Sequence, residues 1–188
     1  MSNLEDRFEE AYSLYQRKHY KESFEKYFLL AEEGHESCQS FVGWMYFSGE
    51  GVQRDLNKAK YWYEKAAKSG DSESLFYLGK IDYINEDYQE AFEKFSKSAL
   101  NSYSPAIYRL GRLYQLGYGV SKNDKKAFDF FLKASNKGHL FARKQLAIYE
   151  MKGYRNFVNR FTGFFNYIYL FVIAIKLGSS DLDEKTLT

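Results

Sequence analysis

The sequence has a single cysteine, Cys38, which excludes an intramolecular disulfide. Small secreted folds that depend on several disulfides are excluded with it. The stretch from Met1 to Arg7 carries acids and no apolar run, so it does not resemble a secretory signal peptide. Together these features predict a protein of a reducing, cytoplasmic compartment.

Proline is equally rare, with one residue in 188, and the formal net charge is only +2. Because proline interrupts helices, its scarcity favours a mostly helical chain. Domains that bind nucleic acids usually carry a strongly basic patch, so the near-neutral charge argues against DNA or RNA as a partner. Apolar residues make up 45% of the chain and aromatic residues 20%. This content is ample for the core of one domain.

Residues that could perform chemistry are scattered. His19, His35 and His139 share no Cys or Asp at the spacing that a metal site requires. Cys38 occupies a position that small residues hold in other parts of the chain, which indicates packing and not nucleophilic chemistry. The sequence therefore predicts no catalytic residue, no metal site, no cofactor and no small-molecule substrate. An enzyme with a hidden site remains an alternative of another class.

Residues 34–70 form a unit on which the rest of the chain is patterned. Small and apolar residues around Gly43 recur at three- and four-residue spacing, which predicts a helix with one buried face. The run Gly49-Glu50-Gly51-Val52 interrupts this helix, because glycine adopts left-handed backbone angles without steric cost. Asp55 is a suitable cap for a second helix that continues to the end of the unit. The unit is predicted to be a helical hairpin.

This pattern returns after 68 residues, with Gly117-Tyr-Gly119-Val120 in place of the first glycine turn. The two glycine turns lack the strand and the Lys-Ser/Thr of a phosphate-binding loop, so we interpret them as turns between helices. Shorter units lie at 4–33 and 71–101, and a single periodic stretch follows at 140–151. Pro105 falls in a first helical turn, where proline is tolerated. Four hairpins and a closing helix are predicted, because such repeats bury their apolar faces only by stacking.

The order of small residue, Leu-Gly or Val-Gly, Tyr, Gly-x-Gly-Val, Asp, Lys-Ala, aromatic pair and Lys-Ala-Ala-x-x-Gly resembles the Sel-1-like repeat, a relative of the tetratricopeptide repeat. Units 34–70 and 102–138 match it closely, with Asn123 in place of the Asp, whereas 4–33 and 71–101 are degenerate. The resemblance implies an all-α, right-handed α-solenoid over residues 1–153 that binds proteins, without naming a partner.

A different segment, 154–178, follows the repeats, and a polar tail occupies 179–188. Residues 161–175 carry no charge and are bracketed by Arg160 and Lys176. This run is shorter than the roughly 20 residues of a membrane span, although flanking cations could extend it. We expect a hydrophobic helix that inserts into or lies on a membrane, docks on a partner, or folds back on the solenoid. The residues expected to make this contact are Phe161, Phe164, Phe165, Ile168, Leu170, Phe171, Val172 and Ile175.

Positions that vary between units predict a partner-binding groove on the first helices of the hairpins. Register positions equivalent to Phe41 and Trp44 should face this groove, which would pass from aromatic to basic along the array. Aromatic and arginine side chains often dominate protein interfaces, and a pair of arginines can bind a carboxylate. The sequence therefore predicts an acidic protein segment as the ligand. The proposed contacts are Phe41, Trp44, Tyr77, Lys80, Arg109 and Arg112.

The predicted function is that of a non-enzymatic adaptor or accessory subunit that holds a protein partner at the cytosolic face of a membrane. The alternative is a soluble regulatory or immunity-type binding protein whose C-terminal helix docks on its target. Membrane extraction separates these two hypotheses, because an integral anchor resists alkaline carbonate whereas a docked helix does not.

Overall fold

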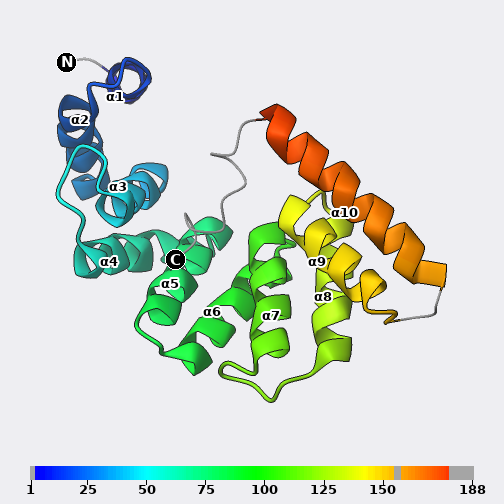
Figure 1. Cartoon of the computed structure of the whole chain (residues 1–188). Helices are drawn as coiled ribbons and strands as arrows, with labels where there is room; N and C mark the ends of the chain where they lie inside the picture. Colours follow the sequence, from blue (N-terminus) through cyan, green and yellow to red (C-terminus); the bar gives the residue numbers. More distant parts are fainter. Residues whose placement is uncertain (1–2, 155–157, 178–188) are drawn as a thin grey trace. The chain divides into compact units, whose positions relative to one another are not determined.

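The computed structural model describes residues 3–154 and 158–177, and in the last helix the side chains from Thr162 to Ile173. Within these ranges the chain is helical and contains no strand, as Figure 1 shows. The chain divides into two compact units, Met1–Asp82 and Tyr83–Thr188, and each is described by itself. The all-α solenoid class predicted from the repeats is confirmed, and the tail 179–188 lies outside the described residues.

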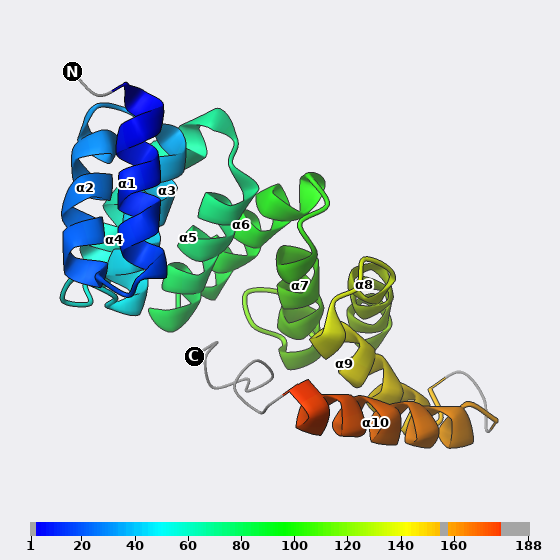
Figure 2. The same ribbon diagram turned by 90° about the horizontal axis from the view of Figure 1, so that it is seen from above.

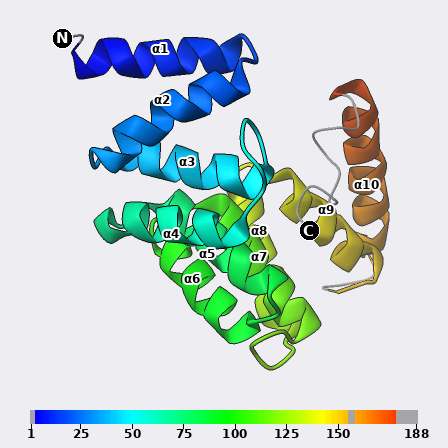
Figure 3. The ribbon, with the colours of Figure 1, turned by 90° about the vertical axis from the view of Figure 1, so that its left-hand side faces the viewer.

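The helices of the first unit are α1 (Leu4–Gln16), α2 (Tyr20–Glu32), α3 (Glu36–Ser48) and α4 (Leu56–Ala66), followed by the short 3-10 helix η1 (Ala67–Ser69) and by most of α5 (Ser72–Ile84). The second unit contains α6 (Tyr88–Leu100), α7 (Ser104–Leu116), α8 (Asp124–Asn136), α9 (Leu140–Met151) and α10 (Val158–Leu177). In Figure 3, α1, α2 and α3 follow one another in an antiparallel zigzag.

The core of the first unit is built from one face of each helix. Ala11 of α1 and Gly43 of α3 are both fully or nearly enclosed, so neighbouring helices approach closely at these points. Ser23 fits against α1 because its hydroxyl donates to the Ala11 carbonyl at 2.8 Å. The larger side chains of this core are Tyr27, Leu30, Val42, Tyr46, Trp62, Tyr63, Leu78 and Ile81.

Both glycine turns are required by backbone geometry. Gly49 and Gly51 have φ of +83° and +74°, values that favour glycine. A Cβ on Gly51 would also overlap the carbonyl of Tyr20 at the start of α2. Gly119 makes the same approach to Tyr88 in the second unit. The second glycine of each turn therefore lets the loop pass over the helix of the preceding hairpin.

The predicted caps are confirmed. Asp55 accepts hydrogen bonds from the backbone N–H groups of Asn57 and Lys58, each at 3.0 Å. Asn123 plays the same part in α8, where it accepts from the N–H of Lys126 at 2.9 Å. Asn can replace Asp here because both side chains offer an acceptor oxygen to an unpaired N–H of the first turn.

In the second unit α10 lies along α9, as Figures 1 and 2 show. The contact is close at Gly163, where a Cβ would lie 2.7 Å from the Cβ of Glu150. Tyr167, Leu170 and Ile173 follow Gly163 at three- and four-residue spacing and are half-buried. The sequence predicted α9 as the closing helix of the repeats and left open whether the hydrophobic helix after it folds back on the solenoid. In the structure the array of described helices ends in the pair α9 and α10. No helix in the described part of the chain is both long and apolar enough to cross a membrane.

Candidate protein-binding site

A hollow of about 640 Å³ lies between the first helices of two successive hairpins in the first unit. We call it the α3–α5 hollow. Its polar rim lies near the N-terminal ends of α3 and α5, and aromatic side chains lie one or two turns further along. The lining residues are Glu36, Ser37, Ser40, Phe41, Trp44, Tyr63, Ser69, Gly70, Asp71, Glu73 and Tyr77.

Aromatic rings form the wall of the α3–α5 hollow. Phe41 and Trp44 stack with ring centroids 5.3 Å apart, and Tyr77 stacks on Tyr63 at 5.0 Å. Phe41 also contacts the ring of Tyr27 at 4.5 Å, so it is fixed from behind by the core. Stacked and edge-on rings that are half-buried present apolar area at little cost in side-chain entropy. The wall is therefore suited to hold an apolar or planar group.

A second hollow, of about 920 Å³, lies between α1 and α3. Glu36 and Ser37 line both hollows, so the two adjoin at the first turn of α3. We call the residues that line the two hollows the first-helix face, because α1, α3 and α5 are the first helices of their hairpins. The lining of this α1–α3 hollow is Asn3, Leu4, Glu5, Phe8, Glu9, Gly34, His35, Glu36, Ser37 and Cys38.

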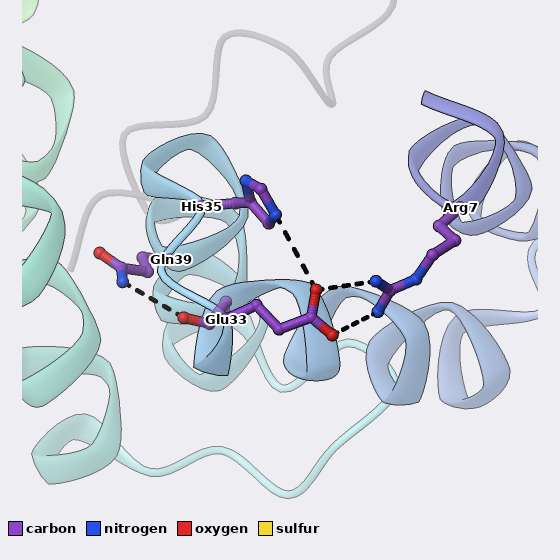
Figure 4. Close-up of polar contacts among 5 residues, drawn as sticks. Arg7, Glu33, His35 and Gln39 are labelled. Carbon is purple, nitrogen blue, oxygen red and sulfur yellow. Dashed lines mark hydrogen bonds and ion pairs between the residues drawn. The ribbon is translucent and has the colours of Figure 1, made fainter. Parts of the chain in front are cut away.

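Polar contacts at the start of α3 hold this face in place (Figure 4). Arg7 of α1 forms two hydrogen bonds of 2.7 Å with the carboxylate of Glu33 at the end of α2. This paired contact raises the pKa of Arg7 and lowers the pKa of Glu33. Gln39 of α3 donates to the carbonyl of Ala31 at 3.2 Å. Gln39 thus connects the first turn of α3 to α2, and the Arg7–Glu33 pair connects α2 to α1.

The charges on the first-helix face are negative. No lysine or arginine is among the described residues that line either hollow. Five carboxylates line them, and no described residue forms an ion pair with any of the five: Glu5, Glu9, Glu36, Asp71 and Glu73. By contrast, Glu10 on the adjacent side of α1 pairs with Lys26 at 2.9 Å.

Two pKa shifts reflect this environment. The Glu73 side chain keeps an exposed surface, but partial burial removes some of its hydration and raises its pKa, and the negative charge of Asp71 adds to the effect. The pKa of the Tyr77 hydroxyl is raised by burial and by Glu73. Asp71 itself accepts hydrogen bonds from the Ser74 N–H at 2.8 Å and from the Ser40 hydroxyl at 3.4 Å.

The structure places the predicted contacts in different surroundings. Phe41, Trp44 and Tyr77 line the α3–α5 hollow, and their part in binding a partner stays a prediction. Lys80 is only 6% exposed, and its ammonium lies 4.6 Å from the centre of the Phe47 ring, so it presents little charge to a partner. The amphipathic stem of lysine permits such burial over aromatic rings.

Arg109 and Arg112 belong to the second unit, and their part of the predicted groove stays a prediction. The Arg109 guanidinium lies 5.7 Å from the centre of the Tyr83 ring. Arg112 donates to the Gln115 side chain at 3.0 Å. Both side chains are half-buried.

The described part of α10 has one face on α9 and one face in solvent. Between Thr162 and Ile173 it carries no charged residue. Leu170 and Phe171 line a small apolar hollow of about 220 Å³ against α9. The exposed apolar side chains are Phe164, Phe165, Ile168, Tyr169, Phe171 and Val172. The side chains of Phe161 and Ile175, which were expected to share this contact, lie outside the described residues.

The other candidates for chemistry are structural. Burial raises the pKa of the Cys38 thiol to about 11, which leaves it unreactive at neutral pH. His139 stacks on Tyr108 at 4.6 Å, and its ring nitrogen accepts from the N–H of Ala142 at 3.3 Å. Burial, together with the charge of Arg109, lowers the pKa of His139 to about 4. In the described part of the chain no group of three His, Cys, Asp or Glu residues could hold a metal ion.

Comparison with known proteins agrees with the glycine turns, caps and hairpins. The Sel1 repeat family matches residues 37–71 and 104–139, which contain the hairpins α3/α4 and α7/α8. The chain therefore carries Sel1-like repeats. The matched residues include both glycine turns and the caps Asp55 and Asn123.

Curated relatives contain comparable repeats inside longer chains. A mimivirus protein named as a putative sel1-like repeat-containing protein is 30% identical over 115 residues, which are 61% of this chain and 21% of the relative. A component of an ERAD-associated E3 ubiquitin-protein ligase from Arabidopsis thaliana is 34% identical over 107 residues, 56% of this chain and 17% of the relative. A chitin synthase regulatory factor from Schizosaccharomyces pombe is 29% identical over 54% of this chain and 24% of the relative. This Sel1-like chain therefore spans about a fifth of the length of these proteins.

Solved structures show the same architecture. A Sel1 repeat protein from Oxalobacter formigenes superposes with a TM-score of 0.76 at 25% identity, over 94% of this chain and 74% of that one. A protective antigen of uropathogenic Escherichia coli gives a TM-score of 0.68 at 25% identity, over 80% of this chain and 34% of that one. The protein MamA, at 18% identity and a TM-score of 0.63 over 94% of this chain and 99% of that one, shares the fold.

Sequence reasoning missed four of the five carboxylates of the first-helix face. It interpreted the acids of α1 as a solvated cap, and the register positions that it considered, those of Phe41, Trp44 and Ser48, include only Glu9 of the five. The same helical stripe continues one turn earlier, at the position of Ser37. This position is occupied by Glu5 in the first hairpin and by Glu73 in the third, and that recurrence is the signal that could have found them.

Proposed function

We propose that this Sel1-like chain is a non-enzymatic adaptor that binds a segment of another protein on its first-helix face. The observation that carries the proposal is the pair of adjoining hollows. The wall of the α3–α5 hollow consists of aromatic rings, and Phe41 in this wall packs on the core. Concave surfaces with aromatic anchors and a polar rim are typical of protein interfaces. The names of relatives as a ubiquitin ligase component and a chitin synthase regulator support a role as an accessory subunit.

The proposal is tested by selecting peptides from a random phage-displayed library on the immobilised full-length chain. Selected peptides are then measured against three variants. Trp44→Ala removes an aromatic anchor, and Ser37→Trp adds a large ring at the junction of the two hollows, where the native side chain is exposed and lines both. Tyr61→Ala is the matched control, because Tyr61 is 51% exposed on α4 outside both hollows.

We expect the first two variants to lose binding by at least about tenfold while Tyr61→Ala stays within about twofold, since buried aromatic anchors dominate binding energy. Circular dichroism at 222 nm confirms that each variant is folded. Ser37→Trp removes no core contact, so it keeps the test decisive if Trp44→Ala is unstable. If the selected peptides bind both variants with the same affinity as the native chain, the proposal is refuted.

A second candidate function is contact with a membrane surface through α10. It is favoured by the six exposed apolar side chains on the described part of this helix and by the absence of charge between Thr162 and Ile173. Helices of this kind can lie in the lipid interface without spanning it. Flotation of the protein with phosphatidylcholine and phosphatidylserine vesicles tests this. Replacement of Phe165 and Phe171 by Ser should abolish flotation, and unchanged flotation would refute it.

A further inference from the structure

We propose that the first-helix face selects a positively charged, extended protein segment, with an Arg or Lys side chain seated between the aromatic wall and the carboxylates of the α3–α5 hollow. This inference rests on the proposed function and specifies the chemistry of its partner. It reverses the charge of the ligand that the sequence predicted, because the Lys80 ammonium is buried over Phe47 whereas the rim of the hollow is acidic.

Charge complementarity identifies the occupant. Among the described residues, no lysine or arginine lines either hollow, whereas five carboxylates do. None of these five carboxylates has an ion-pair partner there. The imbalance extends over the whole first unit. Residues 1–82 carry 15 Asp and Glu against 11 Lys and Arg, whereas residues 83–188 carry 10 against 16. A face of this sign repels phosphate groups, so nucleic acid and anionic lipid are poor occupants and a basic protein segment is a good one.

The aromatic wall of the α3–α5 hollow adds a second attraction for the Arg or Lys side chain of the bound segment. A guanidinium or ammonium can lie over the face of Trp44 while it donates to a carboxylate on the rim. Glu73 lies one helical turn before Tyr77 on α5, and Ser40 lies one turn before Trp44 on α3. The hollow therefore offers ring faces and carboxylate oxygens to one inserted side chain.

The spacing of the helices sets the length of the bound segment. Packed helices lie about 10 Å apart, so a segment that crosses α1, α3 and α5 spans roughly 20 Å. An extended chain covers about 3.4 Å per residue, and about six residues are therefore enough to bring cations to both hollows. Glu5 and Glu9 would meet one end of the segment and Glu73 the other.

The experiment uses a fluorescein-labelled nonapeptide with Arg at positions 2, 5 and 8, Leu at position 4 and Gly or Ser elsewhere. Its matched peptide has citrulline, which is neutral and of nearly the same shape, in place of each Arg. Fluorescence anisotropy at 50 and 300 mM NaCl gives Kd for the full-length chain. We expect the Arg peptide to bind at least about tenfold more tightly at 50 mM NaCl and to lose most of this advantage at 300 mM, because salt screens exposed charges.

Variants locate the effect on the face. Replacing Glu36 and Glu73 together by Gln should reduce the preference for Arg over citrulline to below about threefold. Glu64→Gln removes the same charge from an exposed position on α4 and should leave the preference unchanged. The raised pKa of Glu73 means that its ionised form is disfavoured in the folded protein, so Glu73→Gln should not destabilise the fold at neutral pH.

The outcomes separate this inference from the proposed function. Equal affinity for the two peptides, or a preference that survives in the Glu36/Glu73 variant, would overturn the inference. If library peptides without Lys or Arg bind and depend on Ser37 and Trp44, the adaptor function stands and the basic segment is refuted. If no peptide of either kind responds to Ser37→Trp, both proposals fail.

Discussion

Gly43 and Gly111 hold the same position of the repeat, yet the structure predicts different costs for adding a methyl group to each. In α7 a Cβ on Gly111 would lie 2.6 Å from the Cε1 atom of Phe131. In α3 a Cβ on Gly43 would lie 3.0 Å from the Cδ1 atom of Tyr63. Phe131 and Tyr63 are both 0% exposed, so neither ring can move into solvent.

The expected free energies follow from two opposing effects. Alanine is better than glycine inside a helix by about 1 kcal/mol. Overpacking of a tight core costs about 1–3 kcal/mol, and the cost rises steeply as the contact shortens. Gly43→Ala should therefore change the free energy of unfolding by less than about 0.5 kcal/mol, since a shift of a few tenths of an ångström relieves it. Gly111→Ala should lose about 1–2 kcal/mol, because Phe131 must shift much further.

Urea unfolding followed at 222 nm measures both changes, and 1 kcal/mol corresponds to roughly 2–4 °C in Tm for a chain of this size. Phe131→Leu removes the ring edge that the new methyl would strike. The double variant Gly111→Ala/Phe131→Leu should then be less destabilised than the sum of the two single changes. If Gly111→Ala is as stable as the native chain, or less harmful than Gly43→Ala, the reasoning from these contacts is wrong.

Three further predictions concern polar groups. The pKa of His139 is lowered to about 4 from 6.5, so the unfolded chain binds more protons than the folded chain between these pH values. The free energy of unfolding should therefore fall as the pH drops through that window. His139→Asn keeps an acceptor for the Ala142 N–H and should reduce this loss, as measured by urea unfolding at pH 7 and 4.5. Lys60→Met leaves the carboxylate of Asp82, whose side chain is 3% exposed, without the ammonium 3.0 Å away. It should cost about 1–3 kcal/mol in urea unfolding, and a neutral result would contradict the assigned pairing. Asp55→Ala removes two capping bonds and should lower Tm by the equivalent of about 1 kcal/mol in calorimetry, while an unchanged Tm would show that the cap contributes nothing.

The repeated part of the fold could be predicted from the sequence because each local signal has a periodic partner. Gly49-x-Gly51 and Gly117-x-Gly119 mark the same turn twice, and Asp55 marks a cap that the structure confirms. The reason for the second glycine was not visible in the sequence. It depends on the approach of the loop to a helix of the preceding hairpin, a contact between residues far apart in the chain.

The contact between α10 and α9 has no such periodic signal. Hydropathy marks 161–175 as apolar, but it does not distinguish burial on α9 from burial on a membrane or a partner. Gly163 looks like a helix-weakening residue in the sequence, whereas in the structure it is the point where α10 approaches the backbone of α9. Tertiary contact decides its role.

The candidate site was predicted in part. The register placed Phe41, Trp44 and Tyr77 on the hollow, because repeats conserve the direction of equivalent side chains. The register could not give the sign of the charge around the α3–α5 hollow. The burial of Lys80 depends on the Phe47 ring of another helix, and the role of Glu36 and Glu73 depends on which helical turn borders the hollow.

The account rests on the claim that the first-helix face of the first unit is where a protein segment binds. Backbone amide chemical shifts of the isotope-labelled full-length chain, titrated with a peptide selected on that chain, test it most directly. The account predicts that the largest shifts fall on the first turns of α1, α3 and α5, around Glu5, Ser37 and Glu73. Shifts confined to α10, or to the surroundings of Arg109 and Arg112 in the second unit, would contradict it.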